Sequence, residues 1–568
     1  MLPLLQIKNL SVDFKTESEN TSAIQNVFLE VNKGEIVAIV GESGSGKTVT
    51  SLSILQLLPT PPAVYKSGEI LFSINGTTQI DLLKLSSEQL RNIRGNQIAM
   101  IFQEPMTSLN PVQSCGSQVI ESILVHQYID KTLARQKTIE LFQQVGLSQP
   151  ASMFNVYPHQ LSGGQKQRVM IAIAMSCKPS LLIADEPTTA LDVMVQKKIL
   201  LLIKDLQQQY QMGVIYITHN LGLVAEIADK IIVMYKGAIV ERGTVQKIFT
   251  DAEHPYTKAL LACRPILYTK QERLPVVSDF MEEAEVNDQL SIVNSVSESK
   301  LTLNEQKILL EVKNLKVYFS KKNFWGKIIK EFKAVDDVSF EIQKGETVGL
   351  AGESGCGKTT LGRTLIRMIE PTSGHIFFEG RDIAHVPKEE MRRMRKKIQI
   401  IFQDPYGSLN PRITIGSAIQ EPLKVHGLLK NDYQRKEKVV ELLEKVNLKA
   451  AHFNRYPHEF SGGQRQRICI ARALGLSPEF IICDESVSAL DVSVQAQVLN
   501  LLNDLKKEFG FTAIFISHDL GVVRYISDRI MIMHKGHIEE SGTGDDIWLR
   551  PKKEYTKKLI AAIPKGLT

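Results

Sequence analysis

Short apolar runs alternate with helical patterns along the chain, and this alternation predicts an α/β fold. Residues 36–40 and 347–351 are mainly apolar, and each run precedes a glycine-rich loop. Four further apolar runs end next to acidic or histidine residues: 181–184, 214–218, 480–483 and 513–517. Short strands of this kind indicate a mostly parallel sheet that is covered on both faces. The stretches 104–161 and 404–460 lack such runs, which predicts an inserted helical subdomain.

The same pattern occurs twice in the chain. GESGSGKT at 41–48 returns as GESGCGKT at 352–359, and YPHQLSGGQKQR at 157–168 returns as YPHEFSGGQRQR at 456–467. Self-similarity of this kind fixes the architecture, so we predict two copies of one domain joined head to tail. The predicted domains are residues 1–270 and 307–568.

The spacing of equivalent motifs places an insertion in the first copy. Lys47 and Lys358 are 311 positions apart, whereas Gln103 and Gln403 are 300 apart, so the first copy has 11 extra residues before Gln103. We expect them to form a surface elaboration around residues 59–67. Between the copies, residues 271–306 are acidic and lose periodicity, which predicts a flexible, solvated linker; a regulatory segment is the alternative.

Composition excludes several classes of protein. The chain has 568 residues, and at roughly 150 residues per domain it should form about four folding units, two for each copy. Its net charge of +6 is mild and requires neither nucleic acid nor a membrane surface. The six cysteines include no C-x-x-C pair, which argues against a disulfide scaffold, a zinc ribbon and an iron–sulfur site. No apolar stretch approaches the roughly 18 residues of a membrane span, so we expect a soluble, cytoplasmic protein.

The glycine-rich loops predict phosphate binding. Each follows an apolar strand and precedes a helical run, so backbone N–H groups and a helix start converge on an anion. The lysine can reach the terminal phosphates, and the threonine hydroxyl suits Mg²⁺. The expected ligands are Gly41, Ser43, Gly44, Gly46, Lys47 and Thr48 in the first copy, and Gly352, Ser354, Gly355, Gly357, Lys358 and Thr359 in the second.

Acidic pairs at two strand ends predict phosphoryl-transfer chemistry. Asp185 and Asp484 can orient the water shell of Mg²⁺, and Glu186 and Glu485 follow at once and can align an attacking water. Such a reaction asks mainly for positioning and charge stabilisation, so a polar group near the γ-phosphate completes the site. The candidates for that role are Gln103, Gln403, His219 and His518.

Together these residues resemble a pair of fused nucleotide-binding domains of an ATP-binding cassette (ABC) transporter. The resemblance implies P-loop NTPase domains, each with a RecA-like mixed sheet and an inserted helical subdomain, that bind ATP with Mg²⁺. It also implies that Gln103 and Gln403 sense the metal and that His219 and His518 are switch histidines. The signature motifs are Ser162-Gly163-Gly164-Gln165 and Ser461-Gly462-Gly463-Gln464, and the D-loops are Ala190–Asp192 and Ala489–Asp491. Phe14 and Phe319 would stack on adenine, with ordinary core packing as the alternative.

In the family, each signature completes the ATP site of the opposite domain. One composite site should therefore pair Lys47, Asp185, Glu186 and His219 with Ser461–Gln464, and the other should pair Lys358, Asp484, Glu485 and His518 with Ser162–Gln165. Both glutamates are present, so we predict two hydrolytic sites. The second copy departs from the family by carrying Ser486-Val487 where the first has Pro187-Thr188. Loss of proline frees the backbone there, and we expect a difference in rate between the sites.

Three short motifs favour the dipeptide/oligopeptide importer branch, which also includes nickel, glutathione and peptide-antibiotic importers. They are Ser-Leu-Asn-Pro at 108–111 and 408–411, His-Pro-Tyr-Thr at 254–257, and the proline-rich run at 61–68. The resemblance implies a peripheral subunit on the cytoplasmic face of the inner (plasma) membrane. Its partners would be two permease subunits and an extracytoplasmic solute-binding protein.

The sequence is compatible with two other classes of ABC protein. A soluble tandem ABC ATPase acting on ribosomes or nucleic acid would use the basic run 392–397, but the motif endings differ from such proteins and we expect no nucleic-acid partner. An exporter is disfavoured because no spanning segment is seen. Residues 321–333 mix lysines with aromatic residues and predict a long β-hairpin packed on its own domain; a membrane or permease contact is the alternative.

Overall fold

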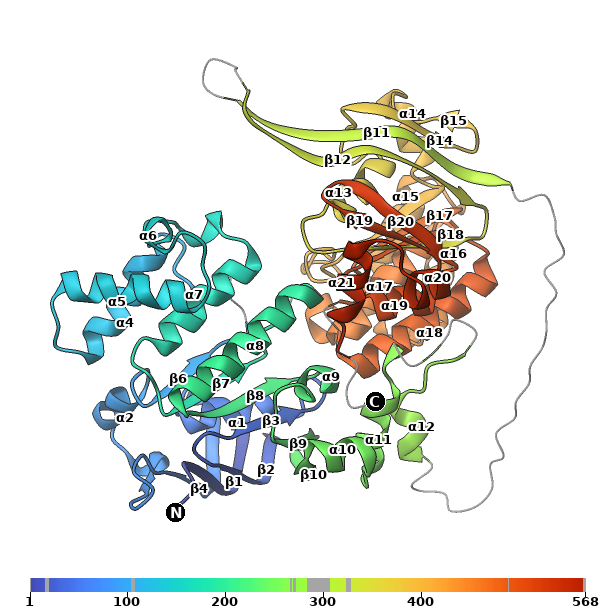
Figure 1. Ribbon diagram of the computed structural model, residues 1–568. Coiled ribbons are helices and arrows are strands. Elements are labelled where there is room, and N and C mark those ends of the chain that lie inside the picture. Colours follow the sequence, from blue (N-terminus) through green and yellow to red (C-terminus); the bar gives the residue numbers. More distant parts are fainter. Residues whose placement is uncertain are drawn as a thin grey trace. The chain divides into compact units, whose positions relative to one another are not determined.

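The chain folds into two units that repeat the same order of elements (Figure 1). The computed structural model describes residues 2–15, 20–103, 108–189, 191–265, 268, 272–282, 307–322, 328–488 and 490–564. By internal packing, the described residues up to Ala262 form the first unit together with Pro564, and those from Cys263 to Ile563 form the second.

A six-stranded sheet forms the centre of each unit and confirms the predicted α/β fold. In the first unit the order is β10(Ala238–Thr244)-β9(Lys230–Tyr235)-β3(Ile36–Val40)-β8(Gly213–Thr218)-β7(Leu181–Asp185)-β6(Ile98–Ile101), and in the second it is β16(Ile398–Ile401)-β17(Phe480–Asp484)-β18(Thr512–Ser517)-β13(Thr347–Ala351)-β19(Arg529–His534)-β20(His537–Thr543). Only β10 and β20 run antiparallel to their neighbours. The central strands are buried along their whole length, because their apolar residues face covered layers on both sides.

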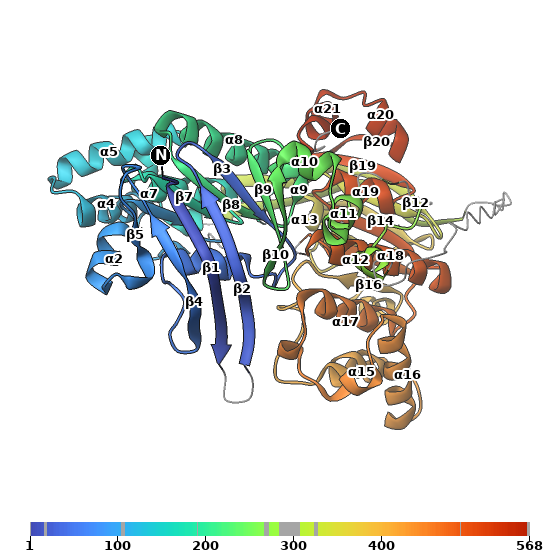
Figure 2. The same ribbon diagram turned by 90° about the horizontal axis from the view of Figure 1, so that it is seen from below.

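A second, antiparallel sheet packs beside this core and is drawn most clearly in Figure 2. Its strands are β2(Asn20–Val31), β1(Leu5–Lys15), β4(Ala63–Phe72) and β5(Ile80–Asp81), and in the second unit β12(Ile328–Gln343), β11(Ile308–Lys322), β14(Ser373–Phe378) and β15(Arg381–Asp382). β4 has 10 residues and β14 has 6, and β4 pairs with β1 as far as Ala63 opposite Phe14. The insertion in the first copy is therefore partly a strand extension.

The predicted hairpin at residues 321–333 is confirmed by the pairing of β11 with β12 through Lys321 and Lys330. Phe332 is 55% exposed, so its ring does not pack on the core as expected. Residues 323–327 lie outside the described part of the chain.

Helices complete each unit. The helical subdomain contains α4(Cys115–His126), α5(Lys131–Gln144), α6(Pro150–Met153) and α7(Gly163–Met175), and in the second unit α15(Ile415–Val425), α16(Asp432–Lys445), η4(Ala450–Asn454) and α17(Gly462–Leu474). The remaining helices are α1(Lys47–Ile54), α2(Ser87–Ile93), α8(Val193–Tyr210), α9(Leu221–Val224), α10(Val245–Thr250), α11(Pro255–Ala262), α12(Val277–Glu282), α13(Lys358–Leu365), α14(Lys388–Met394), α18(Val492–Phe509), α19(Leu520–Ile526), α20(Gly544–Leu549) and α21(Glu554–Ala561), with short turns η1(Leu82–Lys84), η2(Pro158–Gln160) and η5(Pro457–Glu459). Within the described ranges, none has the length and apolarity needed to cross a bilayer.

The segment that follows α11 packs on the second unit, which differs from the expected solvated linker. The backbone N–H of Leu274 donates to Asn500 Oδ1 at 3.1 Å, and the Leu274 carbonyl accepts from Asn500 Nδ2 at 2.8 Å. Tyr525 donates its hydroxyl to the Glu272 carbonyl at 3.0 Å. Leu274 is fully buried, so this part of the chain is held by apolar burial as well as by hydrogen bonds. Packing thus separates the units at 262/263 instead of 270, while residues 283–306 lie outside the described residues.

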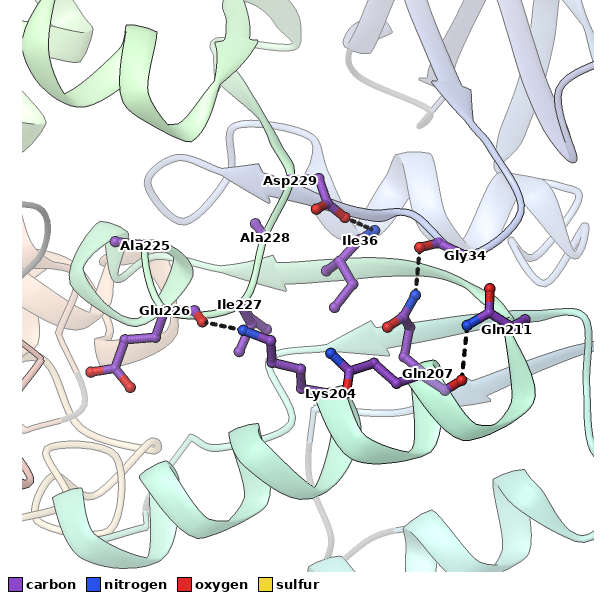
Figure 3. Close-up of a pocket in the computed structure, with 11 residues that line it drawn as sticks. Gly34, Ile36, Lys204, Gln207, Gln211, Ala225, Glu226, Ile227, Ala228 and Asp229 are labelled. Atoms are coloured by element: carbon purple, nitrogen blue, oxygen red, sulfur yellow. Dashed lines mark hydrogen bonds between the residues drawn. The ribbon is translucent and has the colours of Figure 1, made fainter.

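In the first unit, the surface that corresponds to the one that binds this segment contains a cavity of about 350 Å³ (Figure 3). α8 contributes Lys204 and Gln207, and Lys204 Nζ donates to the Glu226 carbonyl at 3.0 Å. Gln207 Nε2 donates to the carbonyl of Gly34 at 2.5 Å. This cavity opens near the first residue of β3, Ile36, whereas the glycine-rich loop follows the last one. It is therefore not the phosphate site, since ligands of such sheets bind at the carboxyl ends of the strands.

Candidate functional site

Each glycine-rich loop connects a buried strand to a helix and surrounds a lysine ammonium group. Gly46 has φ 99°, and a Cβ there would lie 2.6 Å from Ile24 Cγ2, so only glycine fits this turn. Lys47 Nζ donates to the carbonyls of Gly41 and Glu42 at 2.8 and 2.7 Å. Lys358 Nζ makes the equivalent bonds to Gly352 and Glu353, each at 2.8 Å. Each loop therefore holds a nearly buried positive charge where a phosphate would enter.

A threonine and an aspartate form the candidate metal centre. In the second unit Thr359 Oγ1 donates to Asp484 Oδ1 at 2.9 Å, and in the first unit Thr48 Oγ1 and Asp185 Oδ1 are 3.4 Å apart. Burial raises the pKa of Asp185 to about 6 and also raises that of Asp484. Asp484 Oδ2 is buried without a hydrogen-bond partner among the described residues. Hydroxyl and carboxylate oxygens are the ligands that Mg²⁺ prefers, so the donor set fits that ion.

The two candidate metal centres differ by one cation. Arg363 Nη2 lies 3.7 Å from Asp484 Oδ2, and the first copy has Leu52 at the equivalent position. Sequence reasoning missed this arginine, which lies on the helix after the loop and outside every motif. It places a positive charge beside the second aspartate only.

The glutamate after each aspartate collects the predicted polar groups. Gln103 Nε2 donates to Glu186 Oε2 at 3.0 Å, and His219 Nδ1 lies 3.4 Å from Glu186 Oε1. In the second unit Gln403 Nε2 donates to Glu485 Oε2 at 2.8 Å, and His518 Nδ1 lies 3.6 Å from the same oxygen. The structure thus brings together the glutamate, glutamine and histidine of each copy.

Burial and the histidine act in opposite directions on these glutamates. Burial alone raises the pKa of Glu186, but the hydrogen bond and charge of His219, the charge of Lys47 and the Thr189 hydroxyl together outweigh burial and lower this pKa to about 2. Burial also raises the pKa of Glu485, but His518 and the charge of Lys358 together outweigh burial, so this pKa is likewise lowered. Both carboxyl groups are therefore ionised near neutral pH and can accept a hydrogen bond from water.

Thr189 is a further partner that sequence reasoning missed. Its hydroxyl donates to Glu186 Oε2 at 3.0 Å, whereas the equivalent Ser488 donates to the backbone carbonyl of Glu485 at 2.9 Å. Glu186 and Glu485 have φ 45° and 47°, so the turn keeps its left-handed conformation although Pro187 is replaced by Ser486.

The signature motifs begin α7 and α17. Ser162 Oγ accepts from the N–H of Gln165 at 3.3 Å, and Gln165 Oε1 accepts from the N–H of Ser162 at 3.0 Å. The second signature forms the same reciprocal cap between Ser461 and Gln464. A Cβ on Gly164 would lie 2.6 Å from Val195 Cγ1, and one on Gly463 would lie 2.3 Å from Val494 Cγ1. Glycine is thus required because each signature packs closely on the helix that follows its own D-loop.

The two predicted adenine-stacking residues differ in exposure. Phe14 is partly buried and packs against the core of its unit, whereas Phe319 is 46% exposed. Ala190 and Ala489 of the D-loops lie outside the described residues.

The basic run at residues 392–397 ends in an ion-paired lysine. Lys397 forms ion pairs with Glu379 and Glu479, each at 2.7 Å.

This fold and site define an ATP-hydrolysing ABC protein with two cassettes in one chain. The ABC transporter family matches residues 24–189 and 335–488, and the family described as the oligopeptide/dipeptide transporter C-terminal region matches residues 240–287. The chain belongs to the ABC transporter family, in its oligopeptide/dipeptide branch of fused ATP-binding proteins. The prediction of that family from the motifs is confirmed.

Several relatives match almost the whole chain. The "Glutathione import ATP-binding protein GsiA" of Pectobacterium atrosepticum is 46% identical over 99% of this chain and 90% of its own length. The protein of the same name from Salmonella typhimurium is 47% identical over 99% of this chain and 89% of its own. Among solved structures, the dimeric bacterial ABC transporter cassette MJ0796 covers 41% of this chain and 98% of its own, with 27% identity and a TM-score of 0.38.

Proposed function

We propose that this protein hydrolyses ATP to power the import of glutathione or a related short peptide. The observation that carries the proposal is the match to the oligopeptide/dipeptide transporter region, in a chain that is 46% identical to a glutathione import ATP-binding protein over 90% of that protein's length. The two complete sets of polar groups support hydrolysis in both copies.

Each copy would divide the reaction among its own residues. Lys47 and Lys358 bind terminal phosphates, and Glu186 and Glu485 align the attacking water. His219 and His518 contact the γ-phosphate and orient these glutamates. Mg²⁺, when bound, neutralises developing phosphate charge. Its proposed ligands are Thr48, Gln103 and Asp185 in the first copy and Thr359, Gln403 and Asp484 in the second.

The ATP-binding site of each copy would be completed by the signature motif of the other copy. The N-terminal turns of α7 and α17 offer backbone N–H groups that suit an anion. If Ser461–Gln464 completes the Lys47 site, then Ser461→Arg should slow turnover at that site while nucleotide still binds to Lys47. Unchanged turnover in Ser461→Arg and in the matched Ser162→Arg variant would contradict this pairing.

The proposed partners are two permease subunits and an extracytoplasmic solute-binding protein. The protein would then lie at the cytoplasmic face of the inner membrane through those permeases.

The experiment is reconstitution of the complex in liposomes, followed by ATPase and uptake assays. Glutathione or a dipeptide, added with the binding protein, should stimulate ATP hydrolysis and enter the vesicles. Glu186→Gln and Glu485→Gln should each lower turnover at their own site by about 10²-fold or more without loss of nucleotide binding. Stimulation by RNA or ribosomes, with no permease association, would instead support the alternative class of tandem ABC ATPase.

A further inference from the structure

The carboxyl-terminal helix of each cassette reaches the phosphate-binding loop through one tyrosine. In the first unit the backbone N–H of Glu42 donates to the hydroxyl of Tyr256 at 2.9 Å. In the second unit the N–H of Glu353 donates to the hydroxyl of Tyr555 at 3.0 Å. The tyrosines are 299 positions apart, as are other equivalent residues. The same contact therefore occurs twice, although His254-Pro255 before the first tyrosine becomes Lys553-Glu554 before the second.

Each tyrosine ring is held against the strand next to the loop-bearing strand. Tyr256 is fully buried, with its ring centroid 4.3 Å from that of Tyr235, the last residue of β9. Tyr555 stacks on His534, the last residue of β19, at 4.0 Å. β9 and β19 pair with β3 and β13, which lead into the loops. A flat ring at the end of this strand thus fixes the tyrosine in both copies.

An acidic residue fixes the start of each tyrosine-bearing helix. Glu241 on β10 accepts from the N–H groups of Glu253 and His254 at 2.8 and 3.1 Å. Glu540 on β20 accepts from those of Lys552 and Lys553 at 2.8 and 3.2 Å. These groups would otherwise lack partners at a helix start. The hydroxyl is consequently held from two directions, by its ring and by its helix.

The residue that the hydroxyl contacts also orients the phosphate-binding lysine. The carbonyl of Glu42 accepts from Lys47 Nζ at 2.7 Å, and that of Glu353 accepts from Lys358 Nζ at 2.8 Å. One residue of each loop is thus fixed at its N–H by tyrosine and at its carbonyl by lysine. Loss of the hydroxyl would free the loop to rotate and would misplace the lysine's acceptor.

We propose that Tyr256 and Tyr555 are positioning residues for nucleotide binding, which hold the phosphate loops in their binding conformation through a single hydroxyl. This role concerns the ATP-binding step alone and is independent of the transported solute. The tyrosine of the His-Pro-Tyr-Thr motif would thus act within its own cassette, by positioning the phosphate loop.

The test uses the full-length protein with Tyr256→Phe, Tyr555→Phe and both changes together. Calorimetric titration with Mg-ADP and a non-hydrolysable ATP analogue should show affinity about 2- to 10-fold weaker at one of two sites in each single variant, and at both in the double variant. The KM for ATP should rise, while kcat should stay within about twofold of the wild-type value. The reason is that the hydroxyl holds the loop equally before and during the reaction. Tyr210→Phe is the control, since its hydroxyl accepts a 2.8 Å hydrogen bond from Gln144 away from the loop.

Unchanged affinity in Tyr256→Phe and Tyr555→Phe, or an equal loss in Tyr210→Phe, would overturn the proposal. Thermal unfolding of the same samples separates positioning from folding. Tyr555 is partly exposed, so its phenylalanine variant should keep its melting temperature. Weaker nucleotide binding at an unchanged melting temperature supports the proposal. If nucleotide binding weakens only in proportion to a loss of folded protein, the proposal is contradicted.

Discussion

Two buried residues beside the turn that follows Glu186 differ, together, from their equivalents beside Glu485. In the first unit the hydroxyls of Thr188 and Tyr216 are 3.4 Å apart and both residues are buried. Val487 and Phe515 occupy the equivalent positions of the second unit, each 1% exposed. A polar pair is thus replaced by an apolar pair. The unusual Val487 is therefore accommodated by packing, and the turn keeps its conformation.

Thr188→Val should destabilise the first unit by about 1–3 kcal/mol, because it leaves the Tyr216 hydroxyl buried without its partner. Adding Tyr216→Phe should recover most of that loss by reproducing the pair of the second unit. Urea unfolding of the full chain, arranged as a double-mutant cycle, measures the coupling. Strictly additive changes would show that the two hydroxyls do not interact.

The charge beside Asp484 should weaken the metal site of the second copy. Arg363→Leu, which restores the residue of the first copy, should lower the Mg²⁺ concentration needed for half-maximal turnover by about 1.5- to 5-fold, since a partly exposed ion pair contributes only about 0.2–1 kcal/mol. Titration of ATPase activity with Mg²⁺ in a Glu186→Gln background isolates the second site. Arg550→Leu, at an exposed position, is the control; an equal shift there would argue against a local effect.

At the scale of elements, the strands β10 and β20 each support the start of the tyrosine-bearing helix, α11 or α21, through a glutamate carboxylate. For Glu540, burial raises the pKa, but the Thr556 hydroxyl and the N–H groups of Lys552 and Lys553 outweigh burial and hold it below the ordinary value of 4.5. A lowered pKa means that the folded state favours the ionised form. The resulting stabilisation is complete above the unfolded pKa and is lost as pH falls through the folded one.

We therefore expect Glu540→Gln to lower the melting temperature near pH 7 and to lose this effect in acid. The difference from wild type should shrink as pH falls below the ordinary glutamic acid value of 4.5 and through the lowered pKa of the folded protein, because Glu540 itself then becomes protonated. Differential scanning calorimetry across this range measures it, and Glu421→Gln, at an exposed helix position, is the comparison. A difference that stays constant with pH would show that the carboxylate charge is not involved.

The elements show where sequence reasoning succeeds and where it stops. Apolar runs such as 36–40 and 181–184 are predictable because a strand buried on both faces must be apolar throughout. The clusters around Glu186 and Glu485 follow from motif spacing, since parallel strands bring their carboxyl ends to one edge. Arg363 was not predictable, because its effect depends on which side chain faces it across the loop. The strand extension at β4 was missed because an insertion carries no periodic signal that separates loop from strand.

At the scale of the whole molecule, the segment after α11 joins the packing of the unit it precedes. Its acidic composition predicted a linker, but Leu274 is buried and Asn500 matches both of its backbone groups. The first copy has Leu201 at the position of Asn500, and that leucine is 43% exposed. The Asn500 amide on α18 is therefore a contact to this segment that the first copy lacks, and no pattern within residues 271–306 reveals it.

Asn500→Leu should release this segment without harm to α18, because the first copy carries leucine on the same helix face. The amide of Leu274 should exchange hydrogen at least about tenfold faster, and trypsin should cleave faster after Arg273. Hydrogen exchange and limited proteolysis of the full chain measure both effects. Leu201→Asn is the matched variant and should change neither; unchanged protection in Asn500→Leu would show that the Asn500 amide does not hold the segment.

The docked segment also decides how the polypeptide can be dissected. A recombinant second cassette begun at residue 307, where the repeat starts, would lack Leu274 and uncover Asn500 and Tyr525, and it should be prone to aggregate. A fragment begun at Cys263 keeps that surface covered and is the better candidate for expression and crystallisation alone.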